Sequence, residues 1–451
     1  MRYVPPTRVH GRYRQTVTMT SGASVAATWP APRAAGPLAA RIELPGSKSL
    51  TNRALVLAAL SKTPTRITAP LRARDTLLMA GALSSLGVHI AEDGADWLVT
   101  SGPLHGGTVD CGLAGTVMRF VPPVAALAEG SSFFDGDPHA RTRPMGTLLD
   151  GLRQAGVAVS DENTGSLPFT VAGRGSVPGG LVKLDASASS QFVSALLLAG
   201  ARFDRGIEIH HVGKVLPSLP HIEMTVAGLR AAGVDVEDSW ANRWRVAPGE
   251  IDTPDVVIEP DLSNAAPFLA AALAVGGSVT IARWPSSTTQ GGDALRSLLT
   301  EMGAEVRLTP EGLRVTGTGE IRPLVADLHD VSELTPVLAA LCALSSRVSR
   351  LSGVAHIRGH ETDRLAAIRT ELARLGGDVD ETPDGLVIRP ATLHGGTWRA
   401  YADHRMAQAG AVLGLVVSGI GIDDIGSTTK TIADFPALWT SLLGQTEPAA
   451  G

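Results

Sequence analysis

The stretch LSSLGVHI at residues 83–90 joins the end of an apolar helix pattern to a short strand pattern through one glycine. A glycine just past a helix adopts the left-handed conformation that ends the helix, and the alternation after it is typical of a strand. The same Leu-x-x-x-Gly pattern recurs at LRQAGVAV (152–159), LRAAGVDV (229–236), LTEMGAEV (299–306) and LARLGGDV (372–379). Glycines 87, 156, 233, 303 and 376 are thus 69, 77, 70 and 73 residues apart, which predicts a repeated unit of roughly 70 residues.

A second helix pattern recurs at the same period and is apolar nearly all the way round. Such a helix is expected to be buried on every side. Its six copies are NRALVLAAL (52–60), RFVPPVAALA (119–128), QFVSALLLAGA (191–201), APFLAAALAV (266–275), PVLAALCALS (336–345) and MAQAGAVLGLVV (406–417). Polar-alternating strands lie between these helices, so the sequence predicts an α/β fold of six repeats with buried helices inside and strands outside.

The repeats divide into two halves of three. Pro254 and the sequence DLSN at 261–264 mark the expected crossing between the halves. We predict a flexible N-terminal extension (1–38), a discontinuous domain (39–46 plus 261–451) and a second domain (47–260). A cleft between two such halves is where a ligand is expected.

The composition argues against several classes of protein. Of 451 residues, 44% are hydrophobic and 18% are charged, which suits a compact protein, and the net charge of −5 argues against binding nucleic acid or a membrane surface. Cys111 and Cys342 show no zinc spacing and suit a reducing cytoplasm, so we expect no metal and a cytoplasmic location. The apolar run from Met406 to Ile422 is short and broken by glycine, and no signal peptide is evident, so no membrane span is expected.

Short polar loops precede the buried helices, and cationic residues gather in them. A helix N-terminus offers free N–H groups and the positive end of the helix dipole, and Gly and Ser let an oxyanion approach closely. Two of the five lysines of the chain, Lys48 and Lys430, lie in these loops. The loops therefore predict a site for small polyanions, without a nucleotide motif, because GSKS lacks the first Gly of a P-loop.

Seven motifs in these loops occur in a recognisable order. They are LPGSKSLTNRAL (44–55), AGTVMR (114–119), RTRPMG (141–146), SSQFVSALL (189–197), HETDR (360–364), DHRMA (403–407) and the late Lys430. With them the chain resembles the 5-enolpyruvylshikimate-3-phosphate synthase family over about residues 40–443. The resemblance implies a two-domain inside-out α/β barrel, in which each domain has three βαβαββ units with inward helices and the chain crosses twice between domains.

The resemblance also implies an activity and a set of site residues. The reaction would transfer the enolpyruvyl group of phosphoenolpyruvate to the 5-hydroxyl of shikimate 3-phosphate and release phosphate, in a monomer without a cofactor, with glyphosate as inhibitor. The residues expected to bind shikimate 3-phosphate are Lys48, Ser49, Arg53, Ser189, Ser190, Gln191, Ser218, Glu333 and His360. Those expected to bind phosphoenolpyruvate are Lys48, Gly115, Arg143, Gln191, Arg364, Arg405 and Lys430.

Two carboxylates carry the expected chemistry. Glu333 aligns with the base of the family, and Glu361 with a second acidic residue beside the reacting carbon. Lys48 and Glu361 could act as a proton-transfer pair, so the group that protonates the methylene carbon stays open. We expect the reaction to survive the departures of this chain from the commonest bacterial pattern, which are Glu333 for Asp, His360 for Lys, His356 for Asn, Leu113 for Asn and Phe120 for Pro.

Two other functions fit parts of the sequence. The related enolpyruvyltransferase family that acts on UDP-N-acetylglucosamine uses a loop Cys and a Lys-Asn pair, whereas here Lys48 is followed by Ser49 and neither Cys lies in such a loop. A non-catalytic repeat scaffold is disfavoured because Lys48, Glu333 and Glu361 are all present.

Overall fold

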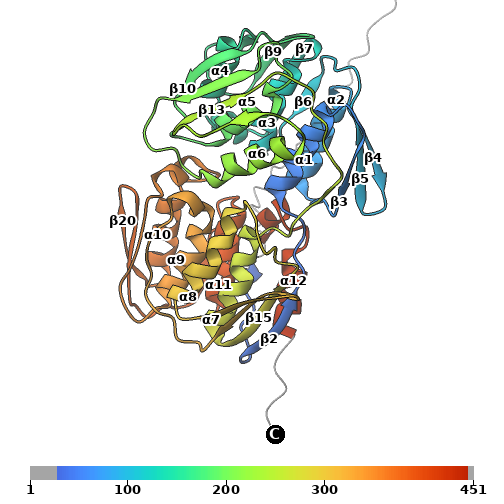
Figure 1. Ribbon diagram of the computed structural model, residues 1–451. Helices are drawn as coiled ribbons and strands as arrows, with labels where there is room; N and C mark the ends of the chain where they lie inside the picture. The colour runs from blue at the N-terminus through green and yellow to red at the C-terminus, as the bar shows by residue number, and fades with distance from the viewer. Residues whose placement is uncertain (1–27, 445–451) are drawn as a thin grey trace, which may run out of the picture.

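The computed structural model describes residues 28–444, which form two lobes, one holding α1 to α6 and the other α7 to α12 (Figure 1). Each lobe has its own hydrophobic core. One core is built from residues between 54 and 258, and the other from residues 38–44 together with residues between 262 and 442. The chain therefore crosses between the lobes twice, once between residues 44 and 54 and once between residues 258 and 262.

The first lobe consists of three βαβαββ units. The first unit contains α1 (Lys48–Leu60), β3 (Thr65–Thr68), α2 (Arg74–Ser85), β4 (His89–Asp93), β5 (Asp96–Thr100) and the distant β14 (Val256–Val257). The second contains β6 (Thr108–Asp110), α3 (Gly115–Ala125), β7 (Glu129–Asp135), the 3-10 helix η1 (Ala140–Thr142), α4 (Gly146–Gln154), β8 (Ala158–Ser160) and β9 (Phe169–Arg174). The third contains β10 (Gly180–Leu184), α5 (Gln191–Gly200), β11 (Ile207–His211), α6 (Pro220–Ala231), β12 (Val236–Glu237) and β13 (Arg243–Val246).

The second lobe repeats this arrangement in two units, whereas its last unit has a sheet of three strands. Its first unit contains β2 (Leu38–Ile42), η2 (Ser263–Ala265), α7 (Ala266–Val275), β15 (Gly277–Ala282), η3 (Gly291–Ala294), α8 (Leu295–Glu301), β16 (Glu305–Thr309) and β17 (Gly312–Gly317). The next contains β18 (Val325–Asp327), η4 (His329–Leu334), α9 (Thr335–Ala343), β19 (Ser349–Ser352), η5 (Ala355–Gly359), α10 (Arg364–Arg374), β20 (Asp378–Thr382) and β21 (Gly385–Arg389). The last contains β22 (Gly396–Trp398), α11 (His404–Gly414), β23 (Ile420–Ile422), η6 (Ile425–Lys430), α12 (Phe435–Gly444) and β1 (Trp29–Pro30).

The two crossings connect the lobes through their sheets. Strand β2 precedes the first lobe in sequence but pairs in parallel with β15 of the second, with Leu38 opposite Gly277. Strand β14 follows the first lobe and pairs in parallel with its β3, with Val256 opposite Ile67. In each lobe, one sheet thus includes a strand that lies beside a crossing. The sheet that contains β3 needs β14, and the sheet that contains β15 needs β2.

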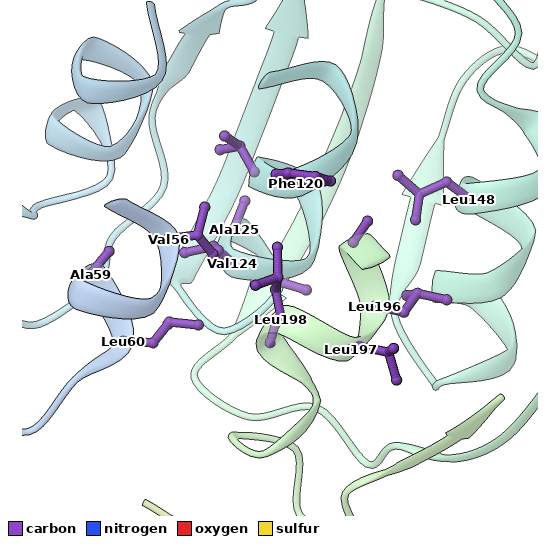
Figure 2. Packing of buried hydrophobic residues seen from close by; sticks show 14 of the residues in the cluster. Val56, Ala59, Leu60, Phe120, Val124, Ala125, Leu148, Leu196, Leu197 and Leu198 are labelled. Carbon is purple, nitrogen blue, oxygen red and sulfur yellow. The ribbon is translucent and has the colours of Figure 1, made fainter. Parts of the chain in front are cut away.

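Both repeated patterns of the sequence are confirmed. The five repeat glycines all have positive φ, between 77° and 103°, and each directly follows the cap of an outer helix. The six apolar patterns form α1, α3, α5, α7, α9 and α11, and every residue of α3 is buried. Figure 2 shows how Val56 of α1, Val124 of α3 and Leu198 of α5 point toward one another inside the first lobe. Small residues such as Ala59 and Ala125 let these helices approach closely.

The prediction of a flexible extension over residues 1–38 is wrong at its C-terminal end, where the chain already belongs to the fold. Trp29 and Pro30 form β1, which pairs antiparallel with β23, and Leu38 begins β2 and is buried. A two-residue strand carries no periodicity in the sequence, so only its distant partner reveals it. Residues 1–27 of the predicted extension lie outside the described residues.

Neither cysteine nor any described helix suggests a further chemistry. Cys111 and Cys342 are buried and free, and burial raises the pKa of each thiol to about 12, so both are protonated and unreactive. Among the helices of residues 28–444, none is both long and apolar enough to cross a membrane.

A pair of glycine substitutions tests the helix packing. A Cβ on Gly410 of α11 would lie 2.6 Å from Cδ1 of Trp398, whose indole is fixed by donating to the carbonyl of Met406 at 2.8 Å. Gly410→Ala should therefore lower the free energy of unfolding by about 1–3 kcal/mol, measured by denaturant titration. Gly81→Ala is the control, because a Cβ on this exposed residue of α2 meets no atom within 4 Å and alanine favours a helix by about 1 kcal/mol. Equal stability of Gly410→Ala and the parent would contradict this packing.

Candidate active site

A cavity of about 350 Å³ lies between the lobes, where the buried helices begin. In the first lobe, α1, α3 and α5 begin at the cavity with Lys48, Gly115 and Gln191. In the second lobe, η2 and η4 lead into α7 and α9, and these short helices and the first turn of α11 line the same cavity. Six helix N-termini therefore surround one space, and their free N–H groups and dipoles favour a negatively charged ligand there.

The residues that the sequence predicted for the site line this cavity. They are Lys48, Ser49, Arg53, Gly115, Arg143, Ser189, Ser190, Gln191, Ser218, Glu333, His360, Glu361, Arg364, Arg405 and Lys430. The structure thus brings together residues that are up to 382 positions apart in the sequence, from Lys48 to Lys430.

The lining of the cavity carries more positive than negative groups. Its seven cations are Lys48, Arg53, Arg119, Arg143, Arg364, Arg405 and Lys430, and its three carboxylates are Asp261, Glu333 and Glu361. The lining histidines add no charge near neutral pH, because burial lowers the pKa of His221, His356, His360 and His404. The cavity is therefore built for anions.

Arg53 is a buried cation with neutral partners. Its guanidinium donates to Thr225 Oγ1 at 2.8 Å and to the carbonyl of His221 at 2.8 Å. It also lies 5.1 Å from the ring centroid of Phe120. No carboxylate of the described residues forms an ion pair with it, although the residue is only 4% exposed. A buried cation is costly unless it is paired, so an anionic ligand is the expected partner.

Arg119 and Arg143 form a second group of cations that lack carboxylate partners within residues 28–444. Arg119 donates to the carbonyls of Gly115 at 3.2 Å and Pro144 at 3.4 Å. Burial, with the nearby Arg143, lowers the pKa of Arg119 well below its usual value. Arg143 has a buried Nε and a buried Nη1 with no hydrogen-bond partner in the described structure. These two groups can donate to the oxygens of a second anion.

Arg364 and Lys430, by contrast, are held by carboxylates. Arg364 donates to Asp403 through Nε at 2.7 Å and Nη2 at 3.1 Å, and to Glu361 Oε2 at 3.0 Å. Burial disfavours the charge of Arg364, but Asp403 and Glu361 more than offset this and raise its pKa. Lys430 Nζ donates to Glu361 Oε1. Burial alone would raise the pKa of Glu361, but Lys430 and Arg364 lower it well below its usual value.

Lys48 lies among groups from both lobes. Its Nζ is 3.4 Å from Asp75 Oδ2, which is itself 4.0 Å from Lys430 Nζ. Burial is the largest effect on Lys48 and lowers its pKa, with Asp75 opposing and Lys430 reinforcing that shift. A lysine with a lowered pKa gives up its proton more readily than an exposed lysine does.

Glu333 is an ionised carboxylate inside the cavity. It accepts a hydrogen bond from Ser263 Oγ at 3.1 Å. Burial alone would raise its pKa, but the charge of His221 when this ring is protonated, the charge of Arg405 and the bond from Ser263 together lower it. An ionised carboxylate with few hydrogen bonds can accept a proton from a hydroxyl that is bound beside it.

His360 is fixed in one neutral tautomer. Its Nδ1 lies 3.1 Å from Nη1 of Arg364, and because guanidinium only donates, Nδ1 accepts. Burial and the charge of Arg364 lower the pKa of His360 well below its usual value, so the ring is neutral and Nε2 carries the hydrogen. His360 can therefore donate one hydrogen bond to a ligand in the cavity.

The resemblance assigned no role to three residues that the structure places at or beside the cavity. Arg119 stands within the AGTVMR motif, and a charged residue in an otherwise apolar helix was the available signal. Asp75 and Asp403 lie behind the cavity cations and are at most 1% exposed. As acidic residues at helix starts they look like ordinary caps, and only their distant partners identify them.

Metal binding finds no support among the described residues, where no group of three or more His, Cys, Asp or Glu is placed to hold an ion.

The pH dependence of stability follows from His356. Burial is the main cause that lowers its pKa from 6.5 to about 4, so between these values the unfolded chain binds a proton that the folded protein does not. Its contribution to stability should therefore fall as pH decreases from about 6.5 to about 4. His356→Gln keeps a donor for Ser332 Oγ, which lies 2.8 Å from the ring. In this variant the slope of the free energy of unfolding against pH should be smaller by up to about 1.4 kcal/mol per pH unit, measured by urea unfolding at several pH values. The control is His394→Gln at an exposed position, and the same slope in both variants would contradict the assignment.

Comparison with known proteins agrees with this geometry. Residues 32–439 match the family described as EPSP synthase (3-phosphoshikimate 1-carboxyvinyltransferase). A 3-phosphoshikimate 1-carboxyvinyltransferase of Kocuria rhizophila is 54% identical over 432 residues, which cover 92% of this chain and 96% of that protein. Two solved structures share the fold. An EPSP synthase from Acinetobacter baumannii has a TM-score of 0.74 at 22% identity and covers 92% of this chain and 97% of its own. The enolpyruvyl transferase NikO from Streptomyces tendae has a TM-score of 0.72 at 18% identity and covers 91% of this chain and 96% of its own. This chain therefore belongs to the EPSP synthase family.

Proposed function

We propose that this chain transfers the enolpyruvyl group of phosphoenolpyruvate to the 5-hydroxyl of shikimate 3-phosphate and releases inorganic phosphate. The carrying observation is one cavity between the lobes, in a fold of the EPSP synthase family, with seven cations and only three carboxylates in its lining. The two substrates together bring two phosphates and two carboxylates, which such a surplus of cations offsets. All groups needed come from one chain, so the proposal includes a monomer, acting in the cytoplasm.

Shikimate 3-phosphate would occupy the part of the cavity beside α1, α5 and η4. Arg53 and Lys48 supply charge there, and Ser49, Ser189, Ser190 and Ser218 supply hydroxyl groups. His360 would donate through Nε2 to a hydroxyl of the substrate, and Gln191 would reach both substrates. The support for this placement is the buried guanidinium of Arg53, which only neutral acceptors contact.

Phosphoenolpyruvate would occupy the part of the cavity beside α3, α10 and α11. Arg143 offers two buried N–H groups without partners in residues 28–444, and the guanidinium of Arg405 donates there to uncharged acceptors, the carbonyl of Ser263 and the amide oxygen of Gln408. Arg364 and Lys430, held by carboxylates, would add fixed charge. Gly115, the first residue of α3, would let the ligand approach the backbone.

Glu333 would take the proton of the 5-hydroxyl as its oxygen attacks the central carbon of phosphoenolpyruvate. The methylene carbon gains a proton in the same addition, which leaves a tetrahedral intermediate with both groups attached. Elimination then breaks the bond to the phosphate oxygen while the new methyl group loses a proton. Lys48, with its lowered pKa, and Glu361, which is paired with Lys430, would donate and recover that proton.

The alternative activity on UDP-N-acetylglucosamine finds no support in the cysteines. A reactive loop cysteine is expected for it, whereas Cys111 and Cys342 are buried with raised pKa values. Phosphate release measured with phosphoenolpyruvate and either shikimate 3-phosphate or the UDP-sugar tests the proposal. We expect release only with shikimate 3-phosphate, and release only with the UDP-sugar, or with neither, would refute it.

Glu333→Gln tests the base. Gln keeps the size and polarity of Glu333 but accepts no proton, so turnover should fall by about a hundredfold or more. Shikimate 3-phosphate should still bind, measured by calorimetry. The control is Glu320→Gln at an exposed site, and turnover of Glu333→Gln within a few-fold of this control would exclude Glu333 as the base.

Gly115→Ala tests the position of phosphoenolpyruvate. The added Cβ would lie 2.9 Å from Nη1 of Arg119 and 3.0 Å from Nη1 of Arg143, so it would intrude where the ligand meets these cations. The inhibition constant of glyphosate should rise about tenfold or more, which corresponds to a misfit of about 1.4 kcal/mol, and the KM for phosphoenolpyruvate should rise less because that ligand is shorter. The measurement is inhibition at several phosphoenolpyruvate concentrations, with Gly249→Ala as the control, since a Cβ there meets no atom within 4 Å. Unchanged sensitivity would show that the ligand lies elsewhere.

A further inference from the structure

We propose that His329 is a positioning residue for shikimate 3-phosphate, whose imidazolium form fastens the loop of residues 216–219 to the helix that carries Glu333. The inference rests on the proposed function, because Ser218 of this loop is expected to bind that substrate. It concerns a residue that does not line the cavity and that acts through its neighbours.

The side chain of His329 connects the two lobes. Its Nε2 lies 2.9 Å from the carbonyl oxygen of Leu216 in the first lobe, and its Nδ1 lies 3.1 Å from the carbonyl oxygen of Gly353 in the second. A carbonyl oxygen only accepts, so each contact needs a hydrogen on the nitrogen. Both contacts are hydrogen bonds only when the ring carries two hydrogens, which is the imidazolium form.

The backbone around His329 holds the same loop. Ser218 donates its N–H to the carbonyl of His329 at 3.2 Å, and Leu219 donates to Asp330 Oδ1 at 3.3 Å. Ser218 has a φ of 54°, which is unfavourable for a residue with a Cβ and persists where surrounding contacts enforce it. Three bonds from His329 and Asp330 therefore fix Ser218 at the cavity, and η4 places Glu333 four residues further on.

The groups around the ring are compatible with its charge. Asp327 Oδ1 accepts from the backbone N–H of His329 at 2.8 Å, and Asp330 is the next residue. The ring of His356 lies edge-on at 5.5 Å between centroids, and burial lowers its pKa to about 4, so this neighbour is neutral. Further titratable groups on the elements packed here are Asp384, which accepts from the N–H of Gly353, Glu333 on η4, Arg358 on η5, Lys214 before the loop, and His221, Glu223 and Arg230 on α6.

Loss of the extra proton would break this connection on one side. One ring nitrogen would then present its lone pair to a carbonyl oxygen, which repels it. The loop would be held by its backbone contacts alone, and Ser218 would be less well placed. Binding of shikimate 3-phosphate should weaken, while the chemical step at Glu333 should change little.

The test compares His329→Leu and His329→Gln with the parent and with the control His394→Leu, an exposed histidine of the same lobe. At pH 6, His329→Leu should raise the KM for shikimate 3-phosphate about tenfold, with kcat and the KM for phosphoenolpyruvate within about threefold. The variant His329→Gln keeps one hydrogen-bond donor, so its KM for shikimate 3-phosphate should lie between those of His329→Leu and the parent. Nuclear magnetic resonance at pH 6 should show two ring N–H protons of His329 protected from exchange with solvent.

A KM for shikimate 3-phosphate that is the same in His329→Leu and the parent would overturn the inference, and so would a single protected ring proton. The resonance experiment uses the unaltered protein, so it decides the question even where a variant folds poorly. A parent enzyme without turnover on shikimate 3-phosphate would contradict the proposed function instead, and the ring protons would still report on the connection between the lobes.

Discussion

The arrangement of this protein depends on six buried helices that begin at one cavity. Each helix is apolar nearly all round, so its sides can only be covered by other helices and by the surrounding sheets. Its N-terminus, with free N–H groups, is then the end that stays available for a ligand. Lys48, Gly115 and Gln191 occupy the first positions of three of these helices, so the same packing that forms each core also positions the site.

A second constraint is the division of the cavity cations into two kinds. Arg364 and Lys430 are held by Asp403, Glu361 and Asp75, which keeps their side chains in place. Arg53 and Arg143 have no carboxylate partner among the described residues and are nevertheless buried. The paired cations hold their side chains in fixed positions, but their charge is largely offset by the neighbouring carboxylates. The cations without carboxylate partners therefore provide most of the attraction for an anionic ligand.

The parts of this structure that the sequence predicts are those carried by local patterns. A glycine such as Gly87 ends a helix by its own conformational freedom, and the apolar run of α7 is buried whatever its neighbours are. Strands β1 and β14 have two residues each and exist only through pairing with β23 and β3, so no local pattern predicts them. Asp75 and His329 are similar cases, since their partners lie in distant segments, and the resemblance of loop motifs identified only the residues within those motifs.

The most direct test is a crystal structure of the protein with shikimate 3-phosphate and glyphosate bound. We expect the first ligand within hydrogen-bond distance of the Arg53 guanidinium, and the second on the N–H groups of Arg119 and Arg143, which have no carboxylate partner in the described chain. Both ligands should contact the two lobes. Ligands bound outside this cavity, or both held only by the carboxylate-paired Arg364 and Lys430, would contradict the account.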